Sequence, residues 1–215
     1  GIDLWKARGT ETRVKEIPDE MDVSTAEPRI GVFVCNCGTN IGGVVSVPRV
    51  AEYASTLPHV VHVEQNLFTC AQDTQDRMKA VIREQRLNRV VVAACSPRTH
   101  EPLFMETLQG CGLNRYLFEM ANIRNQDSWV HSADPASATE KALDLVRMAV
   151  ARVALLRPLR AKRMPLNRRA LVIGGGIAGM TAALGLGEQG FEVVLVEKEP
   201  HLGGLGKELT HTIEG

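Results

Sequence analysis

The chain has 215 residues, of which 44% are hydrophobic, 23% are charged and only 4% are aromatic. The low aromatic content disfavours an all-β sandwich and is typical of α/β layers. The 25 basic and 25 acidic residues cancel, so the charge balance indicates neither a nucleic acid nor an acidic lipid surface as a partner. The length suits two domains, each with a core of its own.

The sequence contains neither a membrane span nor a secretion signal. The longest apolar stretches, such as 148–156, are interrupted by Arg152 and are far shorter than the ~20 residues of a membrane helix. The first residues lack the basic-then-apolar pattern of a signal peptide, and we therefore expect a cytoplasmic protein. The chain begins without Met and ends without a domain boundary, so we expect it to be a piece of a longer protein.

The order of the predicted elements indicates a parallel sheet covered by helices. We expect an arm or linker over 1–28, an α/β domain over 29–133, a helix and basic linker over 134–168, and a second domain from 169 to 215. Strands are predicted at 30–35, 59–63, 89–95 and, more weakly, 116–120. Helices are predicted to begin at Ser46, at Thr69 or Cys70, at Ser96 and at Asp134, on the basis of capping residues and early prolines.

The five cysteines carry the strongest chemical signal in the first half. An odd number without a signal peptide favours metal ligands or free thiols over disulfides. Cys35 and Cys37 leave the first predicted strand, Cys70 lies in the turn after the second, and Cys95 closes the third. Carboxyl ends of parallel strands share one edge, so these thiols are expected to converge, as an iron–sulfur cluster or tetrahedral zinc requires. Cys111 is expected at the opposite edge, as a free thiol.

On spacing alone, buried structural cysteines are an equally good interpretation of this pattern. The cysteines lack the compact Cys-x-x-Cys repeats of ferredoxins and zinc ribbons. A docking module without redox activity therefore stays open as an alternative. An NAD-dependent disulfide oxidoreductase is disfavoured, because the chain contains no Cys-x-x-Cys pair.

Several segments resemble the N-terminal part of the A subunit of heterodisulfide reductase, a family of iron–sulfur flavoproteins. These segments are 33–40, the turn at Cys70, 94–102, 112–114, 121–124 and 128–131. The resemblance implies a [4Fe-4S] cluster on Cys35, Cys37, Cys70 and Cys95. Asn125 stands where we expect an acidic residue in many members. Trp129 and His131 are candidates for hydrogen bonds that tune the cluster or flavin, although packing roles are as well supported.

The resemblance also implies an oxidoreductase subunit that passes electrons between FAD and [4Fe-4S] clusters, with electron bifurcation as one option. Implied partners are disulfide-reducing and ferredoxin-like subunits and a hydrogenase or dehydrogenase that donates electrons; a homodimer is another option. The final acceptor would be a disulfide such as the coenzyme M–coenzyme B heterodisulfide. No residue in the sequence is a candidate general acid, base or nucleophile, so cofactors are expected to supply the chemistry.

A dinucleotide-binding unit is predicted from 169 onward. A buried strand over 170–173 runs into the Gly174-x-Gly176-x-x-Gly179 turn, a helix over 180–189, a strand over 191–196 and Glu197. The glycines would admit a pyrophosphate at a helix N-terminus, and Glu197 would bind ribose hydroxyls, which favours FAD or NAD over NADP. The expected contacts to FAD are Gly174, Gly175, Gly176, Ile177, Ala178, Gly179, Glu197, Lys198, Gly203 and Gly204.

This stretch contains only the first strand–helix–strand unit of a dinucleotide domain, which needs further strands to cover a flavin ring. We therefore expect the isolated chain to bind FAD poorly.

Overall fold

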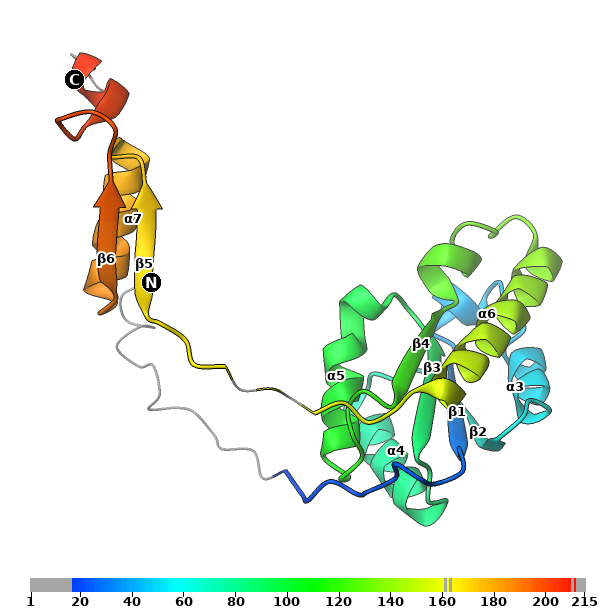
Figure 1. Ribbon diagram of the computed structural model, residues 1–215. Helices are drawn as coiled ribbons and strands as arrows, with labels where there is room; N and C mark the ends of the chain where they lie inside the picture. Colours follow the sequence, from blue (N-terminus) through cyan, green and yellow to red (C-terminus); the bar gives the residue numbers. More distant parts are fainter. Residues whose placement is uncertain (1–16, 161, 163, 210, 212–215) are drawn as a thin grey trace. The chain divides into compact units, whose positions relative to one another are not determined.

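The computed structural model describes residues 17–160, 162, 164–209 and 211 (Figure 1). Contacts divide the chain into two units, 1–160 and 161–215, and each is described here by itself. The part of the predicted arm over 1–16 lies outside the described residues. Within the described part of the chain, no helix is both long enough and apolar enough to cross a membrane.

The first unit is built on a parallel sheet with the strand order β2-β1-β3-β4. Its strands are β1 (Ile30–Cys35), β2 (Val60–Asn66), β3 (Arg89–Ala94) and β4 (Phe118–Asn122), and every neighbouring pair is parallel. All residues of β1 and β3 are buried, as expected for continuous apolar runs in the middle of a covered sheet. The predicted parallel α/β fold is confirmed.

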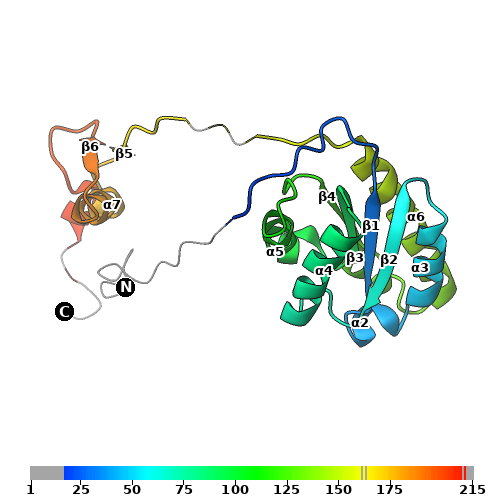
Figure 2. The ribbon, with the colours of Figure 1, turned by 90° about the horizontal axis from the view of Figure 1, so that it is seen from below.

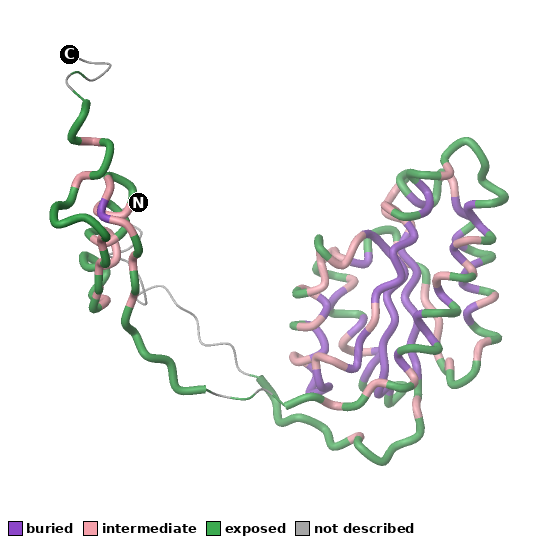
Figure 3. Tube along the Cα trace, turned by 45° about the horizontal axis from the view of Figure 1, so that its top comes forward, coloured by how far each residue is buried: buried purple, intermediate pink, exposed green. Residues whose placement is uncertain are grey.

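Helices cover both faces of this sheet. Figure 2 shows α3 (Val47–Ser55) and α6 (Pro135–Leu155) on one side and α4 (Gln72–Glu84) and α5 (Pro97–Gln109) on the other. Side chains of β1 alternate between the two layers: Val32 packs in the core with α3 and α6, and Phe33 packs in the core with α4 and α5. Buried backbone is accordingly concentrated along the central strands (Figure 3).

Local capping signals set two of the helix starts as predicted. The Ser96 side chain accepts a hydrogen bond from the Arg98 backbone N–H at 3.3 Å, and Asp134 accepts one from Ser137 at 3.1 Å. Prolines occupy the first turns of both helices, where a missing N–H breaks no helical hydrogen bond. Ser46 stands at the cap position of α3 but makes no side-chain hydrogen bond there.

Three element bounds of the first unit differ from the sequence prediction by two residues or more. The helix expected to begin at Thr69 or Cys70 begins at Gln72, because Ala71 directly before it has an extended backbone. Strand β2 extends to Asn66, since its ladder with β1 continues up to Cys35. Strand β4 lies two residues later than expected, at Phe118–Asn122, in register with the end of β3.

Described residues of the arm lie along the first unit. Met21 donates its backbone N–H to Gly112 at 2.8 Å, and Asn88 donates its side-chain amide to the Glu27 carbonyl at 2.7 Å. Helix α6 packs against β3, β4 and α3, so the contacts group it with the sheet and not with the linker that follows.

The second unit consists of one strand–helix–strand repeat. Strands β5 (Arg169–Ile173) and β6 (Glu192–Val196) are parallel and are joined by α7 (Ile177–Glu188); a short 3-10 helix, η2 (Gly204–Glu208), follows. Helix α7 begins at Ile177, directly after Gly176, and not at Met180 as predicted. Apolar side chains of the two strands, such as Leu171 and Ile173, are exposed within this unit.

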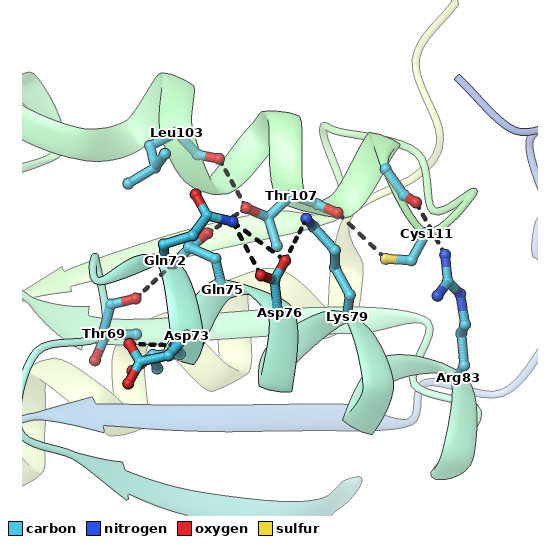
Figure 4. A network of polar contacts seen from close by, with 12 residues as sticks. Thr69, Gln72, Asp73, Gln75, Asp76, Lys79, Arg83, Leu103, Thr107 and Cys111 are labelled. Atoms are coloured by element: carbon cyan, nitrogen blue, oxygen red, sulfur yellow. Dashed lines mark hydrogen bonds and ion pairs between the residues drawn. The ribbon is translucent and has the colours of Figure 1, made fainter. Parts of the chain in front are cut away.

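A buried polar network joins α4 to α5 beside the loop that carries Cys70 (Figure 4). The Gln75 side chain is 2% exposed. Its amide N–H donates to the Thr69 carbonyl at 2.5 Å, and its oxygen accepts a hydrogen bond from the Thr107 hydroxyl. At the far end of α5 the Cys111 thiol donates to the carbonyl of Leu108 at 3.2 Å. Gln75 therefore fixes the loop that leads into α4.

We expect Gln75→Leu to lower the free energy of unfolding by ~1–3 kcal/mol, because it leaves the buried Thr69 carbonyl without a donor. The measurement is urea unfolding followed by circular dichroism. Gln72→Leu is the matched control, since Gln72 lies on the same helix but is exposed to a greater degree and its loss should change stability by no more than about 0.5 kcal/mol. Equal effects of the two substitutions would contradict the role given to Gln75.

Asp127 is a buried carboxylate in the short π-helix η1 (Arg124–Ser128) that follows β4. Its side chain is fully buried, and no hydrogen-bond donor among the described residues reaches either oxygen. Burial raises its pKa to about 6, against the opposing charges of Lys141 and His131. The folded state therefore keeps this proton to a higher pH than the unfolded chain does.

A group with a raised carboxyl pKa destabilises the fold as pH rises through the interval between the unfolded and folded pKa values, here from about 4 to about 6. Replacing Asp127 with Asn removes that titration. We expect the stability of Asp127→Asn relative to the wild type to grow by up to about 3 kcal/mol between pH 4 and pH 7, given ~1.4 kcal/mol per pKa unit. Urea unfolding at several pH values measures it, and a difference that stays constant with pH would refute the assignment.

Candidate functional site

Cysteines lie at or after the carboxyl ends of the first three strands of the sheet. Cys35 is the last residue of β1, Cys95 directly follows β3, and Cys70 lies in the turn after β2. Strands β1 and β3 are neighbours from which the chain runs outward to β2 and to β4. Such a reversal of strand order opens a crevice at the carboxyl ends, where ligands of open α/β sheets bind.

A tight turn places Cys37 beside Cys35. Cys37 and Gly38 have φ angles of +47° and +56°, in the left-handed region that disfavours residues other than glycine by roughly 1–2 kcal/mol. The turn directs the Cys37 backbone N–H to the sulfur of Cys35 at 3.2 Å. Strained backbone of this kind is concentrated at functional sites, and here its effect is to bring a second thiol to the end of β1.

The loop after β2 contacts the same sulfur. The Thr69 backbone N–H lies 3.4 Å from Cys35 Sγ, and the Cys35 thiol lies 3.8 Å from the Leu67 carbonyl. Two backbone N–H groups from different loops therefore point at one sulfur. Hydrogen bonds to ligand sulfurs are among the factors that tune an iron–sulfur cluster, so these N–H groups suit a sulfur that ligates a metal centre.

Burial and the charges of neighbouring cysteines raise the pKa values of Cys70 and Cys95. Burial raises the pKa of Cys70, and the charges of Cys35 and Cys37 raise it further. Burial likewise raises the pKa of Cys95; Arg124 opposes this effect, whereas Cys37, Cys35 and Cys70 add to it. Without a bound cation the thiols of Cys70 and Cys95 therefore keep their protons to a higher pH, and binding of a metal centre would release these protons.

Sequence reasoning missed Arg124, which lies just beyond the end of β4. Its Nη1 is 3.3 Å from Cys37 Sγ, and its guanidinium lies 4.6 Å from the centre of the Trp129 ring. The edge argument that gathered the cysteines applies equally to a residue that follows β4, and would have identified it. His131 instead lies 3.1 Å from the Lys141 ammonium nitrogen, and no contact among the described residues joins it to the cysteines.

Four cysteine thiolates are a donor set that both iron–sulfur clusters and tetrahedral zinc use. Among the described residues, no group of three or more His, Cys, Asp or Glu side chains is arranged to hold one metal ion. A [4Fe-4S] cluster takes one thiolate per iron, so its ligands can stand farther apart than those of tetrahedral zinc. Sulfur-directed N–H groups and one cation complete surroundings that suit an anionic cluster.

Cys111 lies apart from this group. It is buried and free, and its sulfur faces the carbonyls of Thr107 and Leu108 at the end of α5. Its pKa is raised by burial and lowered by Arg83, and none of the other four cysteines contributes.

In the glycine-rich turn of the second unit, the backbone of the turn and of the helix approach each other closely, as the sequence predicts. Gly174 has a φ of +104°, and a Cβ at Gly179 would collide with the Gly174 carbonyl oxygen, so helix and turn touch there. A Cβ at Gly176 would meet nothing within 4 Å. The turn therefore leaves open space beside Gly176, at the start of α7, where an anionic phosphate is favoured.

The segment after β6 returns to this turn. Gly203 donates its N–H to Gly175 at 2.7 Å and forms a parallel bridge with Gly176. Glu197 accepts hydrogen bonds from the N–H groups of Glu199 at 2.9 Å and Gly175 at 2.5 Å, and these bonds, in that order, lower its pKa. Its carboxylate is thus held ionised beside the turn.

The remaining predicted contacts lie around this turn. Ile177 and Ala178 are the first residues of α7. A Cβ at Gly204 would lie 3.2 Å from the Gly176 Cα, so these glycines pack closely. The exposed Lys198 pairs with Glu199 at 3.7 Å. The open space at Gly176, the helix start and the ionised Glu197 together fit the phosphate and ribose of a dinucleotide.

Comparison with known proteins finds a family model for the second unit and relatives that match most of the chain. The family model described as an NAD(P)-binding Rossmann-like domain matches residues 172–213. Over 186 residues the chain is 56% identical to an iron-sulfur A subunit, numbered 2, of the CoB--CoM heterodisulfide reductase of Methanopyrus kandleri. This match covers 86% of the chain and 28% of the relative.

Two further relatives agree. The A subunit of the H(2):CoB-CoM heterodisulfide,ferredoxin reductase of Methanothermobacter thermautotrophicus is 51% identical over 90% of this chain and 29% of its own length. A protein of Archaeoglobus profundus, named for its likeness to the heterodisulfide reductase A subunit, is 51% identical over 83% of this chain and 25% of its own length. The chain thus spans between a quarter and a third of these relatives, and over that span it is similar to the A subunits of heterodisulfide reductases.

Proposed function

We propose that this chain is part of an electron-transfer subunit that holds a [4Fe-4S] cluster on Cys35, Cys37, Cys70 and Cys95. The observation that carries the proposal is the convergence of these cysteines at one sheet edge, where two N–H groups point at the sulfur of Cys35. The name of the Methanopyrus kandleri relative, which describes an iron-sulfur protein, supports the choice of metal centre.

The cluster would supply one-electron transfer, and the protein would supply ligation and surroundings. The positive φ of Cys37 would fix two thiolates on one turn, so that little rearrangement accompanies binding. The N–H donors to Cys35 would stabilise negative charge on sulfur, and burial of Cys95 would limit access of water and oxygen. These are the means by which a protein sets a cluster potential.

We propose that the second unit contributes the phosphate and ribose contacts of an FAD site. The space at Gly176 would admit the pyrophosphate. Glu197, ionised by its two N–H donors, would accept hydrogen bonds from ribose hydroxyls and repel a 2′-phosphate. This favours FAD or NAD over NADP, and the resemblance to the A subunits of heterodisulfide reductases favours FAD.

In the complete protein, we propose that electrons pass between FAD and [4Fe-4S] clusters, and that electron bifurcation is part of this oxidoreductase activity. Flavins exchange electrons in pairs and clusters carry them singly, so the two cofactors together connect two-electron and one-electron partners. The relatives' names, which include CoB-CoM heterodisulfide and ferredoxin, support a disulfide as acceptor, with disulfide-reducing, ferredoxin-like and electron-donating subunits as partners.

After anaerobic purification, we expect a brown chain with about four irons, the content of one cubane cluster held by four cysteines. Cys95→Ser should lose most of the iron and the visible absorbance, because serine replaces a soft thiolate ligand. Iron and zinc analysis together with visible spectra provide the measurement.

Cys111→Ser is the matched control, since Cys111 is as buried as Cys95 but faces only carbonyls at the end of α5. It should keep its iron. A colourless wild type with one zinc or no metal would refute the cluster and favour a docking module. Equal loss of iron in both variants would refute the ligand set.

For the dinucleotide turn, we expect titrated FAD to bind the chain weakly and Gly176→Ala to weaken that binding at least tenfold, about 1.4 kcal/mol. A methyl group at Gly176 meets no protein atom, so the fold should tolerate it while it occupies the space proposed for phosphate. Quenching of flavin fluorescence measures binding.

Gly185→Ala is the control, because a Cβ at this position in α7 also meets nothing within 4 Å but lies away from the turn. Its affinity for FAD should equal that of the wild type. Unchanged affinity in Gly176→Ala would contradict the phosphate site, and stoichiometric flavin after purification would contradict the expected weak binding.

A further inference from the structure

Arg124 contacts the cysteine site from the one strand end that carries no cysteine. It follows β4, and its Nη1 donates a hydrogen bond to Cys37 Sγ at 3.3 Å. Arg124 thus reaches, from the end of β4, a sulfur on the turn that follows β1.

A ring of contacts holds this guanidinium in place. Arg124 lies over the Trp129 ring at 4.6 Å, and the Trp129 indole N–H donates to Asn40 Oδ1 at 3.3 Å. The Asn40 amide in turn donates to the Cys37 carbonyl at 3.2 Å. The ring begins and ends at Cys37, so the position of Arg124 is tied to the turn that carries the sulfur it contacts.

A second brace connects Arg124 to the loop of Cys95. Its Nε donates to Asn125 Oδ1 at 3.3 Å, and the same oxygen accepts the backbone N–H of Ser96 at 3.3 Å. An acidic residue, which the resemblance led us to expect at Asn125, offers oxygens for the same two bonds. The position thus needs an acceptor, and asparagine provides one.

We propose that Arg124 is a positioning residue that raises the midpoint potential of the cluster through its N–H···S bond to Cys37 and its positive charge. The inference rests on the proposed cluster. Reduction adds an electron to an already anionic centre, so a nearby cation stabilises the reduced form more than the oxidised form. Net charge and hydrogen bonds to sulfur are among the factors that set cluster potentials.

The test is an anaerobic redox titration of the 215-residue chain, monitored by electron paramagnetic resonance, with iron content measured on the same samples. Arg124→Gln should titrate at a lower potential than the wild type. We expect at least a tenfold change in the ratio of oxidised to reduced cluster at a given potential, which is ~59 mV for a one-electron couple. Arg124→Lys keeps the charge but not the planar fork, and should fall between the two.

Arg115→Gln is the matched control. Arg115 also lies over an aromatic ring, that of Tyr116 at 5.6 Å, but it precedes β4 whereas Arg124 follows it. Its replacement should leave the potential unchanged. Trp129→Leu removes the ring that supports Arg124 without removing the charge, and should lower the potential by less than Arg124→Gln does.

The outcomes separate this inference from the proposed function. Equal iron and equal potential in wild type and Arg124→Gln would overturn the inference and leave the cluster standing, and so would an equal shift in Arg115→Gln. A wild type without iron would overturn both. If Arg124→Gln holds no cluster, Trp129→Leu decides: a lower potential supports the inference and an unchanged one overturns it.

Discussion

The parallel ladder between β1 and β3 is the constraint on which the cysteine site depends. Val34 of β1 pairs with Ala93 of β3, so Cys35 and Cys95 leave the sheet at nearly the same level. An antiparallel partner would bring an amino end to this edge instead. On its other side β1 pairs with β2 up to Cys35 and Asn66, which places the loop of Cys70 beside the same sulfur. Backbone pairing, and not proximity in sequence, assembles the site.

Side chains and strained turns determine the conformation of the loops that follow the strands. The buried central strands have no freedom to adjust, because Val32 and Phe33 are locked into separate cores on the two faces. The backbone of the loops that follow these strands therefore adopts the unusual conformations that the site needs. Cys37 adopts a left-handed backbone, and the Thr69 N–H of the loop before α4 points at the sulfur of Cys35. A bound metal centre would contact the cysteine sulfurs that these loops bring together. We therefore expect metal binding and ordering of the loops at this edge to be coupled.

The limits of sequence reasoning follow from this division. Strand periodicity and the Ser96 and Asp134 caps are local signals, and they located the parallel sheet and two helix starts correctly. The predicted start of α4 was wrong, because the backbone stays extended at Ala71 and no side chain caps the helix there. Arg124 was missed although it follows β4 at the same edge as the cysteines, because its partner, Cys37, lies 87 residues earlier and no local pattern marks the contact. Asp127 gave no signal either, since its burial is a property of the packed unit.

The dinucleotide turn is the opposite case, because nearly all of its contacts are made within one strand–helix–strand repeat. Gly179 contacts Gly174, and Gly203 bridges to Gly176, so a short stretch of sequence specifies the turn residue by residue. The same locality explains what the unit does not provide. No described residue of α7 is buried, and apolar side chains of β5 and β6 are exposed within the unit. Such a turn would orient the phosphate of a dinucleotide, but burial of a flavin ring requires neighbours that this repeat does not supply.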